Sequence, residues 1–277
     1  LLPENPNGDF TVIRNTTATR VNSSGFIEVV AANVARFNYL TVGGNPFLLD
    51  EPQGTNAFPN SEDYSTAFWS KSLQITVNAS VSPSGLTNSD DCKVLSSSSQ
   101  ANLRNTVANV SAGVSYAISF YVKKKTGTGI CGISRFNGIS DVSVSFDLNN
   151  ETVIFQSTGA TGNIVNANNG WYRILMLVNS VSGESNNIIK FVASKTGNPL
   201  LGTLDDVFSV WGAQFEIGAN TSSYISTTTS AVTRNADVIT RTPPTGTVKI
   251  TTTFSDNTTQ VLTTIPATYT TPEGIIK

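Results

Sequence analysis

Short stretches in which apolar and polar residues alternate recur along the middle of the chain. In Tyr116–Val122, the side chains of Ile118, Phe120 and Val122 fall on one face. This period of two is typical of β-strands that turn one face towards a core. Other stretches are apolar on both faces, as expected of a strand buried on two sides. Five strands are predicted in this way, over residues 116–122, 142–147, 171–178, 188–193 and 207–215.

Turn-forming residues separate these stretches. Ser111–Gly113, Lys123–Gly129 and Asn168–Gly170 combine glycine with serine, threonine or asparagine, which is turn chemistry. Short strands at a spacing of about ten residues indicate a sandwich or jelly roll. No window keeps a convincing helical period, and Val29–Phe37 is the nearest approach. We therefore expect an all-β chain with a jelly-roll β-sandwich.

The residue composition changes twice along the chain, and these changes predict three regions. Residues 1–57 mix short apolar pieces with Asn, Thr and Gly, and residues 58–232 hold the strand series and all three tryptophans. Residues 233–277 are rich in threonine. Within this last region, 247–254 and 258–265 flank a turn and predict a hairpin. Because its faces carry few large apolar residues, we expect it to pack on the sandwich, another subunit or a partner.

The composition is dominated by small polar residues. Ser, Thr and Asn together number 96, against 36 charged residues, while 39% of the chain is hydrophobic. This apolar content excludes a disordered chain. A chain with a net charge of −2 lacks the excess of basic residues that binding to nucleic acid needs. No apolar run approaches the length of about 18 residues that a membrane span needs. The start at Leu1 has neither Met nor a signal sequence, so we expect a processed or truncated chain.

The absence of histidine narrows the chemistry further. Without histidine there is no Ser-His-Asp triad, Cys-His dyad or His-ligated zinc site. The two cysteines, Cys92 and Cys131, are too few for a disulfide framework. Two alternatives remain open: one bridge between strands, or two separate buried thiols. The chain is therefore expected not to be an enzyme. The exception to consider is a polysaccharide depolymerase that works with two carboxylates.

Several acidic residues stand next to one another in the sequence. Asp90–Asp91 and Asp205–Asp206 are examples, but neighbours in a strand point to opposite faces and make poor cooperating pairs. No cofactor is expected. The alternative is a calcium site on the sandwich loops, for which Asp205, Asp206 and Glu216 are the candidate ligands.

Aromatic side chains on loops can stack on sugar rings. Tyr64, Phe68 and Trp69 lie in a segment rich in serine and are the candidate glycan-binding platform. Trp171 and Trp211 lie within apolar strands and are predicted to be core residues.

Several stretches of the chain, in the same order, resemble a family of bacteriophage virion proteins found in tail fibres, tail tips and head fibres. One difference is Gly54, where the family commonly carries arginine. The matching stretches are Thr16–Val21, Val30–Phe37, Leu48–Asn56, Asn60–Lys71, Ser119–Lys123, Asn169–Arg173, Trp211–Glu216 and Thr221–Asp237.

The resemblance implies a jelly-roll domain like a carbohydrate-binding module, preceded by a short adaptor and carried on the virion surface, often as a trimer. It carries over no catalytic residues. The leading hypothesis is a non-enzymatic fibre or capsid-decoration subunit of a virion, whose partners are capsid or tail proteins and further copies of itself. Residues 1–57 or 233–277 would dock to the particle. The alternative is an adhesin that binds host surface glycans, and a polysaccharide depolymerase comes third.

Overall fold

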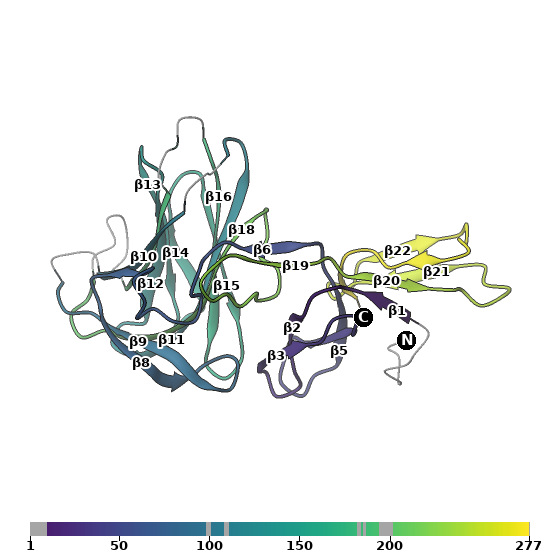
Figure 1. Cartoon of the computed structure of the whole chain (residues 1–277), viewed down its shortest axis with the longest axis horizontal. Helices are drawn as coiled ribbons and strands as arrows, with labels where there is room; N and C mark the ends of the chain where they lie inside the picture. Colours follow the sequence, from purple (N-terminus) through teal and green to yellow (C-terminus); the bar gives the residue numbers. More distant parts are fainter. Residues whose placement is uncertain are drawn as a thin grey trace. The chain divides into compact units, whose positions relative to one another are not determined.

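The computed structural model describes residues 10–97, 101–107, 111–181, 184, 187–193 and 202–276 (Figure 1). The described residues form strands, turns and loops and no helix, so the chain is all-β. It divides into two compact units. The sandwich unit comprises Thr55–Thr221 and Ser226–Val232, and the terminal unit comprises Leu1–Gly54, Ser222–Ile225 and Thr233–Lys277.

The sandwich unit consists of two six-stranded antiparallel sheets. In the first sheet the strand order is β14 (Thr152–Gln156), β13 (Asp141–Asp147), β12 (Ile130–Phe136), β17 (Asn187–Ala193), β10 (Ala101–Val107) and β7 (Ser70–Lys71). In the second sheet the order is β15 (Ala160–Asn166), β16 (Tyr172–Asn179), β11 (Ser115–Thr126), β18 (Val207–Ile217), β9 (Thr87–Lys93) and β8 (Gln74–Val81). All five predicted strands are present, as β11, β13, β16, β17 and β18.

One hydrophobic cluster joins the two sheets of the sandwich. Phe120 of β11 is fully buried, and its ring centroid lies 5.8 Å from that of Phe191 on β17 in the opposite sheet. Ile118 and Val122 belong to the same cluster, as their predicted common face requires. Trp171 and Trp211 are also buried, which confirms the prediction that they are core residues.

The two ends of the chain interleave within the terminal unit. Its first sheet places β20 (Val238–Arg241) between β1 (Phe10–Ile13) and β23 (Tyr269–Thr270). Its second places β5 (Pro46–Asp50) between β4 (Arg36–Tyr39) and β24 (Gly274–Ile276). Two hairpins complete it, namely β2 (Ala18–Val21) with β3 (Ile27–Val30) and β21 (Ile250–Thr253) with β22 (Thr259–Leu262).

This arrangement differs from the three regions expected from the sequence. The segments before and after the sandwich form one unit, in which Leu48, Ile239 and Ile276 share a small core. The chain changes unit within β6 (Gly54–Asn56) and within β19 (Val232–Arg234). The window Val29–Phe37 holds the end of β3 and the start of β4 instead of a helix. The predicted threonine-rich hairpin is confirmed as β21 and β22.

Candidate functional site

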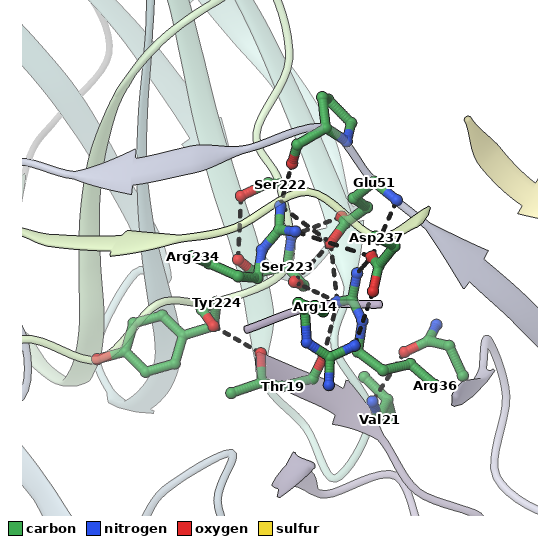
Figure 2. Close-up of polar contacts among 12 residues, drawn as sticks. Arg14, Thr19, Val21, Arg36, Glu51, Ser222, Ser223, Tyr224, Arg234 and Asp237 are labelled. Atoms are coloured by element: carbon green, nitrogen blue, oxygen red, sulfur yellow. Dashed lines mark hydrogen bonds and ion pairs between the residues drawn. The ribbon is translucent and has the colours of Figure 1, made fainter. Parts of the chain in front are cut away.

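Three buried arginines share two carboxylates in the terminal unit (Figure 2). Nη1 of Arg14 lies 2.7 Å from Oδ1 of Asp237, and Nη2 of Arg36 donates to Oδ2 of the same carboxylate. Nη1 of Arg36 lies 2.9 Å from Oε2 of Glu51, and Nη2 of Arg234 lies 3.4 Å from that oxygen. We call these five side chains the arginine network.

Each arginine of the network also donates to a main-chain oxygen. Arg14 donates to the carbonyl of Ala31 at 2.7 Å, and Arg36 donates to that of Thr19 at 3.0 Å. Arg234 donates to the carbonyl of Pro52 at 2.7 Å. Ser223 approaches from a third segment, with its amide nitrogen and Oγ 2.8 and 2.7 Å from the carboxylate oxygens of Glu51. Segments far apart in the sequence are therefore joined at one point.

The role of the network is structural. Guanidinium groups are not deprotonated in proteins, so the arginines offer neither a general acid nor a general base. Both carboxylates are occupied by hydrogen bonds and ion pairs to the arginines and to Ser223. Buried ions of this kind are tolerated because each is paired and hydrogen-bonded.

Four of the five residues of the arginine network lie in three of the stretches on which the expected resemblance rests. Arg36 lies in Val30–Phe37, Glu51 lies in Leu48–Asn56, and Arg234 and Asp237 lie in Thr221–Asp237. Sequence reasoning assigned no function to these four residues. Their charge is a signal that could have singled them out, because only 13% of the residues in this chain are charged.

The expected glycan-binding platform does not form. Tyr64 is 0% exposed and Trp69 is 1% exposed, whereas Phe68 is 49% exposed. The ring of Trp69 packs edge-on against that of Tyr64, with 5.0 Å between the centroids, and its Nε1 donates to the carbonyl of Asn60 at 3.0 Å. A buried ring offers no face to a sugar, so the platform is reduced to the single ring of Phe68.

A lysine ammonium organises the loop that carries these aromatic residues. Nζ of Lys71 lies 2.8 Å from the carbonyl oxygen of Ser65 and 3.2 Å from that of Tyr64. It lies 3.3 Å from the carbonyl oxygen of Thr66 and 3.4 Å from that of Trp69. Four converging carbonyls resemble the oxygen ligands of a bound cation, and here a side chain supplies the charge.

The three candidate calcium ligands do not converge. Asp206 is buried and accepts a hydrogen bond from the amide of Thr128 at 3.0 Å, while Asp205 pairs with Lys93 at 2.8 Å. Glu216 is buried near the far end of β18, roughly 30 Å along the strand at about 3.3 Å per residue. No group of three or more Asp, Glu, His or Cys residues in the described part of the chain could hold a metal ion. These three residues therefore do not form the proposed site.

Both cysteines are free and buried in the core of the sandwich. Burial raises the pKa of the Cys92 thiol well above its usual value, and the carboxylates of Asp90 and Asp91 raise it further. Burial and the carboxylate of Asp147 raise the pKa of Cys131 in the same way. Both side chains therefore behave as small apolar groups and not as nucleophiles.

Comparison with known proteins gives remote similarities to solved structures. No protein-family model matches the chain, and no curated protein matches it. It is similar to the enzymatically active domain of tailspike protein 4 from bacteriophage CBA120, at 14% identity and a TM-score of 0.39, over 59% of this chain and 21% of that one. It is also similar to the CBM22-1 and GH10 modules of endo-1,4-β-D-xylanase 10B from Clostridium thermocellum, complexed with xylohexaose. That match has 15% identity and a TM-score of 0.39, over 63% of this chain and 30% of that one.

The chain thus spans under a third of the length of either solved structure. At these TM-scores the likenesses carry no conclusion about activity or ligand. Among the described residues there is no helix long and apolar enough to cross a membrane.

Proposed function

We propose that the chain is a non-enzymatic structural protein of a phage virion, a fibre or capsid-decoration subunit. The sandwich unit is displayed on the particle, and the terminal unit makes the assembly contacts. The observation that supports this division is the arginine network. Four of its five members come from the stretches that resemble virion proteins, and they build the terminal unit instead of a reaction centre.

Homo-oligomers, with the trimer favoured, are part of the proposal. Strand β22 pairs only with β21 among the described strands, so its outer edge is available to a neighbouring chain. A two-stranded hairpin is marginally stable by itself, and exposed edges readily pair with further strands. Native mass spectrometry of the full chain is expected to give a trimer. A monomer at every concentration would contradict this part.

The acids of the sandwich support a non-enzymatic role. Asp90 accepts hydrogen bonds from the amides of Tyr64 and Asn78 at 2.9 and 3.0 Å. Its neighbour Asp91 pairs with Lys125 at 2.8 Å and accepts from Ser209 at 2.7 Å. These carboxylates hold loops and strands together. Incubation with host surface polysaccharide is expected to release no new reducing ends, and their release would favour a depolymerase.

Particle association is the direct test of the main proposal. The protein is expected to remain with intact particles through density-gradient purification, in a fixed ratio to the major capsid protein. Its loss from the particles at the first gradient would contradict a structural role. A glycan-binding adhesin is the second candidate, and a cavity in the terminal unit favours it.

A further inference from the structure

A cavity of about 500 Å³ lies within the terminal unit. This volume falls in the range of roughly 300–1,000 Å³ that is usual for small-molecule sites. Strands from both ends of the chain contribute to its wall. The lining residues are Phe10, Leu48, Arg241, Pro243, Pro244, Thr247, Lys249, Ile250, Thr251, Thr252, Thr253, Tyr269, Thr271 and Ile276.

Hydroxyl groups make up much of the lining. Five threonines and Tyr269 face the cavity, and the Tyr269 hydroxyl is hydrogen-bonded to Oγ1 of Thr252. A hydroxyl both donates and accepts, so a row of them matches a ligand that also carries several hydroxyls. Phe10, Pro243 and Pro244 provide the apolar part of the wall. Such a mixture suits a sugar ring, which has polar edges and an apolar face.

Two cations give the cavity its charge. The guanidinium of Arg241 is held over the ring of Phe10, with Cζ 5.6 Å from the ring centroid. Lys249 is exposed and forms no hydrogen bond or ion pair with another described residue. No carboxylate belongs to the described lining. One lining residue is hydrogen-bonded to an acid: the hydroxyl of Thr271 donates to the carboxylate of the buried Asp50.

We propose that this cavity binds an acidic sugar, that is, a pyranose ring that carries a carboxylate. The carboxylate lies against Arg241 and Lys249, and the ring hydroxyls bond the threonines. An inorganic anion would leave the apolar wall unused. The hydroxyls of Thr247, Thr252 and Thr271 already have partners within the protein, but an aliphatic acid would offer no hydroxyl to those of Thr251 and Thr253. A sugar acid satisfies the cations, the hydroxyls and the apolar wall together.

The proposal rests on the glycan-binding alternative and is independent of the virion role. Binding in solution neither requires nor demonstrates particle association. The two can therefore fail separately.

Isothermal titration of the full chain with digalacturonic acid, and with cellobiose as the neutral control, tests the proposal. The acidic disaccharide is expected to bind with millimolar affinity, at least about tenfold more tightly than cellobiose, because both cations contribute. Lys249→Gln is expected to weaken binding about two- to fivefold, since an exposed ion pair is lost. Lys124→Gln removes a lysine of the sandwich unit that bonds Asn149, and it is the matched control with no expected effect.

Three results would overturn the proposal. One is equal affinity for the acidic and neutral disaccharides, and another is unchanged affinity in Lys249→Gln. The third is inorganic sulfate binding as tightly as the sugar acid, which would show a general anion site. Arg241→Lys keeps the charge and is expected to bind digalacturonate more weakly than the native chain, because it loses the planar fork that recognises a carboxylate. Circular dichroism on each variant verifies that it is folded.

Discussion

Arg36 and Asp237 are 201 positions apart in the chain, and the guanidinium of the first donates to the carboxylate of the second in a fully buried ion pair. The contact ties β4 to the segment just before β20. The terminal unit is therefore completed only when both ends of the chain are present. Its stability should depend on this pair more than on any exposed charge.

Asp237→Asn tests this dependence. It removes the charge shared by Arg14 and Arg36, and it leaves the buried guanidinium of Arg14 without a counter-ion and that of Arg36 with Glu51 alone. Breaking a buried pair from one side costs about 3–5 kcal/mol, and we expect the free energy of unfolding of the terminal unit to fall by that amount. Hydrogen exchange in a urea series, followed on peptides from residues 10–54 and 233–276, measures it.

The control for this variant is the partly exposed pair of Arg20 and Glu28 in the β2–β3 hairpin, where Nη2 lies 2.7 Å from Oε1. Glu28→Gln is expected to cost less than about 1 kcal/mol because solvent screens the pair. Equal losses in Asp237→Asn and Glu28→Gln would contradict the structural role of the arginine network.

Asp50 should make the terminal unit sensitive to pH. Burial raises its pKa to about 7, and the nearby carboxylates of Asp237 and Glu273 also raise it, while the Thr271 hydroxyl and Arg36 lower it. The folded state therefore holds this proton more tightly than the unfolded state. Its stabilising contribution is complete below about pH 4 and is lost as the pH rises through 7.

Asp50→Asn isolates this effect. The variant should be more stable than the native chain at pH 8, by about 1–3 kcal/mol, and should show little difference near pH 4. Urea midpoints of both proteins across that range give the comparison. A variant that is destabilised equally at both pH values would show that the Asp50 proton has no such role.

Lys71 should hold the loop that buries Tyr64 and Trp69. Lys71→Met keeps the apolar stem but removes the ammonium from four carbonyl oxygens. We expect a loss of about 2–3 kcal/mol, as for hydrogen bonds to a charged group, with a red shift of tryptophan emission as Trp69 becomes solvated. Lys124→Met is the surface control, and an unshifted emission spectrum in Lys71→Met would count against the arrangement.

The two thiols should be inert in the folded protein. Because burial raises the pKa of both Cys92 and Cys131, a thiol reagent at pH 8 is expected to label neither in buffer and both in concentrated urea. Mass spectrometry counts the labels. Labelling of either cysteine under native conditions would mean that the core of the sandwich opens on the time scale of the experiment.

The sandwich was predictable because its signals are local. The alternation in Tyr116–Val122 and the apolar run that ends at Val178 each predict a strand, whichever strand it pairs with. The structure has β11 and β16 at these positions. The calcium ligands could have been separated on the same basis, since about ten residues of extended strand keep Asp206 away from Glu216.

The features that sequence reasoning missed depend on contacts between distant segments. The arginine network joins residues up to 223 positions apart, and no periodicity reports such a pair. Tyr64 and Trp69 lie in a serine-rich segment that is typical of an exposed loop. The contacts of this segment are with the Lys71 ammonium, which donates to the carbonyl of Ser65, and with Asp90, whose carboxylate accepts from the amide of Tyr64.

A density map of the intact virion tests the proposed structural role. We expect density for the sandwich unit on the particle surface. We also expect the terminal unit, residues 10–54 and 233–276, to contact a capsid or tail protein or another copy of the chain. Purified, infectious particles whose map and peptide spectra contain no trace of the chain would contradict it.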